Sequence, residues 1–257
     1  IVNECVRLVN DGVKEIMLLG QNVNSYGKGD DDGVTFPELL HMVSEVPGIK
    51  RVRFMTSHPK DCSDELIKEM ASNPKVCNQL HLPVQAGSTK VIKDMNRVYT
   101  KESYLELVDK VKKAMPDCVI TTDMIVGFPT ETEDDFLETL DLMEKVRYDG
   151  VFSFIYSRRE GTPAAKMTDV FTEEELKNRF DRLLKLDEKI RTENNEKRLG
   201  QIFEVLVEEE TSEGNLESRT EGSLLVHFKG DKSLIGTFQK VKIIEAKGYY
   251  LTGELIK

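Results

Sequence analysis

The sequence lacks any apolar run that approaches the roughly 18 residues of a transmembrane helix. It also lacks a basic segment followed by an apolar one at its start, which is the pattern of a secretory signal peptide. We therefore expect a cytoplasmic location and no membrane partner. The 257 residues suffice for one large domain, or for a large and a small domain.

Cysteine and histidine are scarce and scattered along the chain. No two cysteines stand in a CxxC or CxxxCxxC spacing, which argues against a local cysteine site for zinc or an iron–sulfur cluster. We therefore expect free thiols in a reducing compartment and no metal site within this sequence. The residues concerned are Cys5, Cys62, Cys77, Cys118, His41, His58, His81 and His227.

Positive charge is also in short supply, because the formal net charge is -10 at pH 7. Broad, non-specific affinity for nucleic acid needs a positive field, so the composition argues against it, although a local basic groove remains compatible. The sequence contains neither a phosphate-binding P-loop nor a serine framed as G-x-S-x-G. Signatures of these two enzyme classes are therefore absent.

The first 199 residues contain a repeated alternation of strand and helix patterns. Short apolar runs bounded by turn residues are typical of buried parallel strands, and they fall at 15–19, 52–55, 79–84, 119–128 and 151–156. Amphipathic patterns predict helices at 36–46, 64–72, 90–96, 103–115 and 133–146. Such repeated units predict an α/β fold with a parallel sheet and helices outside it.

The pattern changes after a long final helix, predicted at 173–199 and capped by Thr172 with Glu175. From Gly200 short strands separated by glycine turns are predicted at 201–208, 223–228, 240–245 and 249–256. This pattern of short strands and glycine turns predicts a small all-β barrel. We therefore place the domain boundary at 199/200, giving domains 1–199 and 200–257. The acidic stretch 28–33 is expected to be a solvated loop.

Polar loops follow each of the five predicted strands. Because ligands bind at the carboxyl ends of strands in parallel α/β folds, loops in register at that edge predict an active site. Amides and hydroxyls dominate, which suits a polar, zwitterionic cofactor that carries the reactive chemistry. Asp123 lies within an apolar strand, where a carboxylate is costly unless it is paired or binds a ligand. His58 is either a general base or a loop-fixing residue, and His81 is a candidate core residue.

The loops carry specific sequence motifs: Gly20-Gln21-Asn22-Val23-Asn24-Ser25-Tyr26-Gly27, Thr56-Ser57-His58-Pro59, Leu80-His81-Leu82-Pro83-Val84-Gln85-Ala86-Gly87-Ser88, Ile125-Val126-Gly127-Phe128-Pro129-Thr130-Glu131-Thr132 and Phe154-Ile155-Tyr156-Ser157-Arg158-Arg159-Glu160-Gly161-Thr162-Pro163-Ala164. In this order they resemble the signatures of radical S-adenosylmethionine (SAM) methylthiotransferases. Residues 200–257 are similar to the TRAM domain, the small barrel that ends these enzymes. The resemblance implies a partial (β/α) TIM-like barrel of the radical SAM type, followed by that all-β TRAM barrel.

Within the family, residues 21–24 are most similar to the branch that methylthiolates C2 of N6-isopentenyladenosine next to the tRNA anticodon. The resemblance implies that a [4Fe–4S] cluster reduces one SAM to a 5′-deoxyadenosyl radical, while a second SAM supplies the methyl group. It also implies SAM or substrate contacts by polar side chains, and close backbone approach at two glycines. These residues are Gln21, Asn22, Ser57, Gln85, Asp123 and Arg158, with Gly87 and Gly127.

The resemblance further implies that residues 200–257 hold tRNA, in a protein expected to be monomeric. Phosphate contact and base stacking could come from Lys229, Lys232 and Lys240 with Phe228 and Phe238. This segment carries fewer Lys and Arg than Asp and Glu, which is unusual for an RNA-binding domain. For each phenylalanine taken alone, a place in the barrel core is the favoured alternative.

One departure from the family is large. Its CxxxCxxC loop is missing here, and we expect both that loop and an N-terminal domain with a second cluster to precede residue 1. The first residues already form a helical pattern with neither Met nor cap, which is typical of a fragment. Cys5 has no neighbouring cysteine and does not replace the loop. We predict that these 257 residues hold no such cluster and are inactive alone.

Three alternatives stay open on the sequence. The first keeps the family but changes the substrate to ribosomal protein S12 or another tRNA adenosine. The second is a non-catalytic RNA-binding remnant, which a genuine start codon at Ile1 would support, whereas an upstream CxxxCxxC motif would support the enzyme. The third, an unrelated cofactor-free barrel enzyme, lacks an obvious catalytic pair. Catalytic residues are not assigned.

Overall fold

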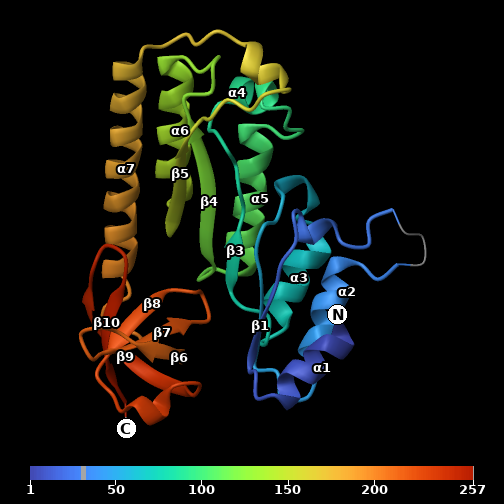
Figure 1. The fold of residues 1–257 in the computed structure, drawn as a ribbon, viewed down its shortest axis with the longest axis vertical. Helices are drawn as coiled ribbons and strands as arrows, with labels where there is room; N and C mark the ends of the chain where they lie inside the picture. Colours follow the sequence, from blue (N-terminus) through green and yellow to red (C-terminus); the bar gives the residue numbers. More distant parts are fainter. Residues whose placement is uncertain (30–32, 257) are drawn as a thin grey trace. The chain divides into compact units, whose positions relative to one another are not determined.

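The computed structural model describes residues 1–29 and 33–256. Residues 30–32 of the acidic loop predicted at 28–33 therefore lie outside the described residues. The chain divides into two compact units, Ile1–Leu186 and Asp187–Lys257 (Figure 1). Within the described ranges, no helix is long and apolar enough to cross a lipid bilayer.

The strands of the first unit are parallel and form two sheets. Strands β1 (Glu15–Leu18) and β2 (Arg51–Phe54) pair with each other. Strands β3 (Gln79–His81), β4 (Val119–Val126) and β5 (Gly150–Ile155) form the second sheet in that order. The predicted strands are confirmed, but the single sheet expected from the sequence is divided.

The division has a local cause, which is a change of pairing partner just before β3. The Val52 amide donates to Lys75 O at 2.7 Å, and the Cys77 amide donates to Val52 O at 2.9 Å. One residue later the partner is already β4, because the Val119 amide donates to Asn78 O at 3.1 Å. The segment before β3 therefore joins the two sheets without extending either as a full strand.

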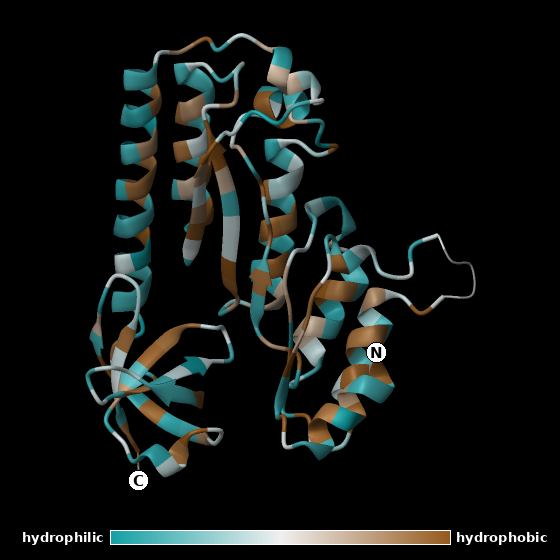
Figure 2. Cartoon of the chain, viewed as in Figure 1, coloured by the Kyte–Doolittle hydropathy of each residue, from teal (hydrophilic) through white to brown (hydrophobic). Residues whose placement is uncertain are grey.

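Helices cover one face of these sheets, and Figure 2 shows hydrophobic residues on the strands and on the helix faces turned toward them. Ser63 and Thr132 act as N-caps, accepting hydrogen bonds from the amides of Leu66 and Asp135, each at 3.2 Å. The predicted helices are confirmed within a few residues at their ends. The helices of this unit are α1 (Val2–Asn10), α2 (Phe36–Ser44), α3 (Asp64–Ser72), α4 (Thr89–Asp94), α5 (Lys101–Ala114) and α6 (Glu133–Val146).

The opposite face of the second sheet, here called the inner face, carries the functional side chains. Residues alternate along β4, so that Met124 is buried while Thr121, Asp123 and Ile125 are only half-buried on the inner face. In the parallel register Asp123 pairs with Phe152 of β5. The inner face therefore combines polar and aromatic side chains.

Helix α7 (Glu173–Glu196) follows and spans the division between the two units. Its capping box is confirmed, because the Thr172 amide donates to Glu175 Oε2 at 2.7 Å and the Glu175 amide donates to Thr172 Oγ1 at 3.2 Å. The contact-based division falls inside this helix, at 186/187. The boundary at 199/200 stays a prediction.

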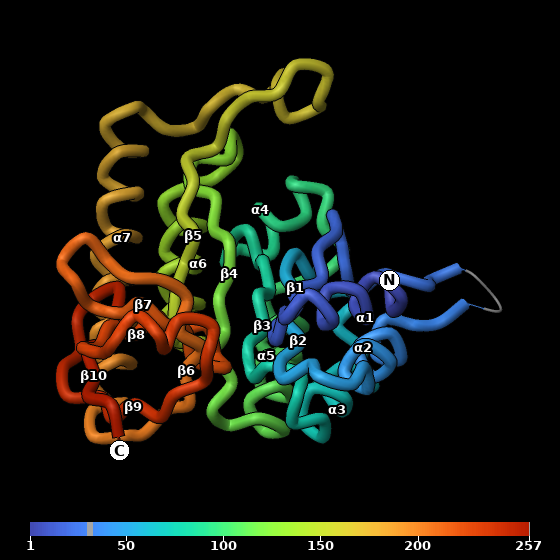
Figure 3. Tube along the Cα trace, turned by 60° about the horizontal axis from the view of Figure 1, so that its bottom comes forward, coloured from blue at the N-terminus to red at the C-terminus, as the bar shows by residue number. Residues whose placement is uncertain are grey.

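The second unit contains a closed five-stranded barrel, which Figure 3 shows as a ring of strands. The sequence missed β7, because its buried positions include Ser218 and Thr220 in place of apolar residues. The barrel core is apolar and includes Val205, Val226 and Phe228. The strands are β6 (Ile202–Glu210), β7 (Leu216–Thr220), β8 (Leu225–Phe228), β9 (Phe238–Ala246) and β10 (Leu251–Leu255).

Candidate functional site

A cavity of about 990 Å³ lies at the carboxyl ends of β4 and β5 and beside the loop that follows β3. This is the edge at which parallel α/β sheets bind ligands. Its volume is at the upper end of the roughly 300–1,000 Å³ typical of small-molecule sites. Its lining residues are Gln85, Lys93, Asp94, Met95, Asn96, Arg97, Asp123, Ile125, Phe128, Phe154, Ile155, Tyr156, Ser157, Arg159, Thr162, Pro163 and Ala164.

Asp123 lines this cavity and is held by one neighbour. Its Oδ1 lies 3.4 Å from His81 Nε2, and its side chain is 29% exposed. His81 is itself fixed, because its Nδ1 lies 3.0 Å from Thr121 Oγ1 and its ring contacts Phe152 edge-on at 5.6 Å. The expectation of a satisfied core histidine is confirmed. Among the described residues the carboxylate thus pairs with His81, and it remains open to the cavity.

Gln85 is the second predicted contact residue in the cavity wall. Its amide donates to Asp123 O at 3.0 Å, and its carbonyl accepts from the Ile125 amide at 2.8 Å. These bonds hold its backbone beside β4 although its φ is 72°, in the left-handed region that non-glycine residues rarely adopt. Backbone strain of this kind is concentrated at functional sites. It sets the direction in which the Gln85 side chain leaves the loop.

The loop after β1 does not reach the cavity, and its polar residues instead bind the loop after β2. Asn22 Nδ2 and Lys28 Nζ donate to the two oxygens of Asp61, each at 2.6 Å. Asn24 exchanges hydrogen bonds with the backbone of His58, at 2.9 and 3.1 Å. Although burial acts to raise it, the hydrogen bonds from Lys28 and Asn22 hold the pKa of Asp61 below its ordinary value.

Other predicted residues of these loops differ in exposure. Gln21 is exposed at the start of its loop. The Ser57 hydroxyl is buried and donates to His81 O, so it joins the loop after β2 to β3. Asn22 Oδ1 is buried with no hydrogen-bond partner in the described part of the chain. None of these residues lines the cavity.

The prediction for Gly87 and Gly127 was close backbone approach to a ligand, and the structure gives each glycine another reason. A Cβ on Gly87 would lie 2.3 Å from Thr139 Cα in α6, and the Gly87 amide donates to Thr139 Oγ1 at 2.9 Å. Gly127 has a φ of 80°, and a Cβ there would lie 2.4 Å from a methyl carbon of Leu176. Both glycines allow loop and helix to pack closely.

Arg158 also differs from its predicted role. Its guanidinium donates to the carbonyls of Ala164, Ala165 and Met167 at 2.8–3.3 Å and to Asp169 Oδ1 at 2.7 Å. The side chain therefore shapes its own loop and does not line the cavity. Its neighbour Arg159 does line it.

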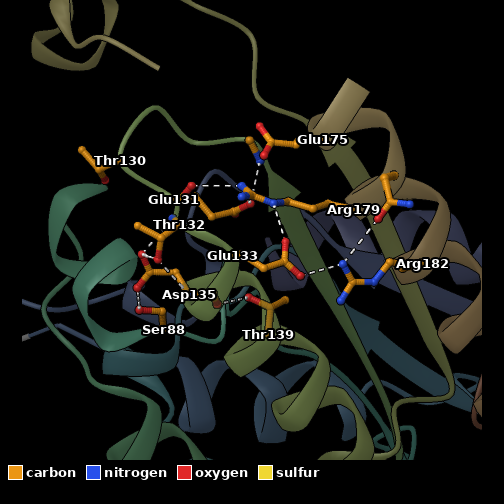
Figure 4. A network of polar contacts seen from close by, with 12 residues as sticks. Ser88, Thr130, Glu131, Thr132, Glu133, Asp135, Thr139, Glu175, Arg179 and Arg182 are labelled. Atoms are coloured by element: carbon orange, nitrogen blue, oxygen red, sulfur yellow. Dashed lines mark hydrogen bonds and ion pairs between the residues drawn. The ribbon is translucent and has the colours of Figure 1, made fainter. Parts of the chain in front are cut away.

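A buried polar network holds the loop between β4 and α6 (Figure 4). Arg179 of α7 donates to Glu131 O at 2.9 Å, to Glu131 Oε1 at 3.3 Å and to Glu133 Oε2 at 3.1 Å. Glu131 Oε1 also accepts from the Gly127 amide at 3.3 Å. Burial raises the pKa of Glu131 to about 7, against the opposing effects of the Gly127 amide and Arg179. The motif at 127–132 therefore holds the loop between β4 and α6 in place beside the cavity.

The described residues do not fit an iron–sulfur cluster. Cys5, Cys62, Cys77 and Cys118 are all buried as free thiols, and burial raises the pKa of Cys62 to about 12, so it resists forming the thiolate that a metal needs. No group of three or more His, Cys, Asp or Glu that could hold a metal occurs among residues 1–29 and 33–256. The predicted absence of a cluster site stays a prediction.

The cavity does fit SAM on the chemistry of its donors. SAM carries a sulfonium and an ammonium group, a carboxylate, and a flat adenine base. The cavity offers Asp123 and Asp94 to the cations, Lys93, Arg97 and Arg159 to the carboxylate, and aromatic rings to the adenine. Of the residues that line the cavity, the sequence predicted Gln85 and Asp123 as contacts and did not predict the others. Residues 93–97 in particular form the end of α4 and the turn after it and follow no strand, so no sequence rule points to them.

The residues predicted to contact RNA are spread over the small barrel. Phe228 is 1% exposed in the barrel core, which corrects its assignment as a stacking residue. Phe238 is half-buried, while Lys229 and Lys240 are exposed. Lys232 pairs with Glu210 at 2.7 Å.

Comparison with known proteins gives two domain families. The profile of the Radical SAM superfamily matches residues 1–143, and that of the TRAM domain matches residues 196–256. Proteins named tRNA-2-methylthio-N(6)-dimethylallyladenosine synthase from Thermoanaerobacter sp. (strain X514) and Clostridium botulinum (strain Langeland) are 54% and 51% identical over 100% and 98% of this chain. The chain spans about half the length of these relatives, 55% and 57% respectively.

A solved structure agrees at the level of the fold. Coproporphyrinogen III oxidase from Escherichia coli, a radical SAM enzyme, aligns with a TM-score of 0.53 at 12% identity, covering 90% of this chain and 59% of that one. The superfamily profile covers more than half of the present chain. This chain therefore belongs to the radical SAM superfamily and carries a TRAM domain that follows its α/β unit in the sequence.

Proposed function

We propose that this chain provides the SAM- and adenosine-binding part of an enzyme that methylthiolates C2 of N6-isopentenyladenosine in tRNA. The observation that carries the proposal is the cavity lined in part by Gln85 and Asp123, in a chain 54% identical over its full length to a protein named tRNA-2-methylthio-N(6)-dimethylallyladenosine synthase. The TRAM profile match is consistent with an RNA substrate. A monomeric, cytoplasmic protein is part of the same proposal.

In this site, bound SAM supplies the radical chemistry and the methyl group. Asp123, fixed by His81, neutralises a positive group of the cofactor, while Arg97 or Arg159 pairs with its carboxylate. The side-chain amide of Gln85 fixes the orientation of the bound cofactor through hydrogen bonds. No step is assigned to an iron–sulfur cluster, because the described residues do not fit one.

The substrate adenosine is matched by the apolar side of the cavity. Phe154 and Ile155 are 52% and 47% exposed at its wall, and Phe152, which shares a face of β5 with Phe154, is 51% exposed. Exposed apolar side chains beside a cavity are a common sign of a binding surface. An adenine bearing an isopentenyl chain is flat and apolar at that end, so it covers this wall well.

The test is mass spectrometry of tRNA nucleosides and of ribosomal protein S12 from a strain that lacks the gene. We expect the methylthio group on isopentenyladenosine to disappear and to return with the complete gene. Loss of the modification from ribosomal protein S12 or from another adenosine, with isopentenyladenosine still methylthiolated, would assign one of the other substrates. Retention of every such modification would favour the non-catalytic RNA-binding protein.

A further inference from the structure

The strand order of the small barrel defines which of its faces is suited to nucleic acid. The ring runs β10-β8-β7-β6-β9, and β8 and β10 are its parallel pair. This is the order of the five-stranded OB-fold barrel. OB-folds bind oligonucleotides on the outer face of their second and third strands and on the loops after the first and fourth strands. Here those elements are β7, β8 and the loops 211–215 and 247–250.

Aromatic side chains gather on this side of the barrel. Tyr250, in the loop before β10, stacks on His227 of β8 with ring centroids 4.5 Å apart and an interplanar angle of 29°. Tyr249 is 77% exposed, and the Arg191 guanidinium lies 3.8 Å from the centre of its ring. The Lys247 ammonium lies 5.6 Å from the ring of Tyr250. Rings held by such contacts offer their remaining faces to a ligand.

Core packing does not explain this arrangement. Tyr249 keeps most of its surface in water, so it gains little from burial. His227 lies opposite Glu217 in the β7–β8 register, and its Nε2 is 3.2 Å from Glu217 Oε2, which fixes its ring. Nucleobases stack on exposed aromatic rings whatever their sequence.

The charges on this side are nearly balanced. Arg191 pairs with Asp187 at 3.0 Å, Lys247 with Glu245 at 3.5 Å, and Arg219 of β7 with Glu208 at 3.0 Å. Each cation therefore has an internal partner and does little to neutralise phosphate. A ligand bound here is recognised mainly through its bases, and the salt dependence of binding should be shallow.

We propose that this surface, made by Tyr249, Tyr250 and His227 and here called the aromatic face, binds an unpaired stretch of the tRNA substrate by base stacking. The inference rests on the proposed tRNA substrate and names the surface that holds it. It moves the RNA contacts from Lys229 and Lys240 to the loop before β10. Arg191 acts as a positioning residue that holds the Tyr249 ring.

The test compares tRNA binding by the protein from the complete gene with tRNA binding by its Tyr249→Ala variant. The ligand is isopentenylated tRNA that lacks the methylthio group. We expect the Kd to rise about tenfold, as the loss of one stacked base implies, and by a similar factor at low and high salt. Tyr249→Phe keeps the ring and should bind as the wild type does. The paired variant Lys229→Ala/Lys240→Ala should change the Kd less than Tyr249→Ala.

The outcomes separate the surface from the function. If the wild type binds and modifies tRNA while Tyr249→Ala binds equally well, the aromatic face is not the RNA surface. A larger loss from the lysine variant would likewise overturn the inference. If the wild type itself neither binds nor modifies tRNA, the proposed function fails first. The SAM affinity of each variant, which should not change, reports that the first unit is intact.

Discussion

At the scale of single residues, neighbours decide what a side chain can do. Asp123 was expected to be costly to bury unless paired, and the structure gives it His81 as partner while leaving it open to the cavity. Arg158 lies one residue from a cavity-lining arginine, yet its hydrogen bonds all go to its own loop. Sequence motifs mark such loops, but they do not tell which of two adjacent arginines faces a ligand.

We predict that Asp123→Asn weakens SAM binding about tenfold, because a charge-assisted contact is replaced by a neutral one of the same shape. Equilibrium dialysis with the protein from the complete gene measures the Kd. Asp117→Asn, an exposed aspartate after α5, is the matched control and should bind normally. Equal affinity of the two variants would show that Asp123 serves only to position His81.

Glu131 gives a second residue-scale prediction, which concerns pH. Its folded pKa of about 7 lies above the roughly 4.3 of an unfolded glutamate, so the folded state keeps a proton that the unfolded chain has lost. Its contribution to the free energy of unfolding is therefore complete below that lower value and is lost as pH rises toward about 7.

Glu131→Gln removes this titration. It should therefore weaken the dependence of the free energy of unfolding on pH in this range. Denaturant unfolding of both proteins between about pH 5 and about pH 8 measures the difference, in which the other titrating groups cancel. We expect the advantage of wild type over variant to shrink as pH rises through this range. Parallel profiles would contradict the raised pKa.

At the scale of elements, capping and periodicity placed most helices and strands, whereas packing explained the glycines. The capping box of Thr172 with Glu175 forms as its sequence indicates. Strand β7 was missed because Ser218 and Thr220 occupy inward positions, where the Ser218 hydroxyl donates to Val226 O at 2.8 Å. Polar residues buried in this way break the alternation on which strand prediction depends.

Gly87→Ala should destabilise the first unit, because its Cβ would lie 2.3 Å from the backbone of α6. Overpacking of this kind costs about 1–3 kcal/mol, and the shift of the loop should also disturb Gln85. Gly150→Ala is the matched control, since its Cβ would meet Thr121 at an ordinary 3.7 Å. Chemical denaturation measures the free energy of unfolding of both variants. Equal stability of the two would contradict the packing role of Gly87.

At the scale of the whole molecule, the chain combines an α/β unit that carries the cavity with a separate small barrel. None of the four cysteines is placed for a cluster, as all are buried free thiols. We therefore predict that reconstitution of these 257 residues with iron and sulfide leaves no stoichiometric cluster. Iron and acid-labile sulfide analysis measures this, and a bound cluster at one per chain would contradict it.

The sequence by itself determined the strands and helices of the first unit, the change to a small barrel, and the family, because these depend on local periodicity, caps and motifs along the chain. Tertiary structure alone decided the division of the sheet, the residues of the cavity at 93–97, and the aromatic face of Tyr249, Tyr250 and His227. These features depend on which distant segments meet. Loop direction and strand order bring such segments together, and neither follows from local pattern.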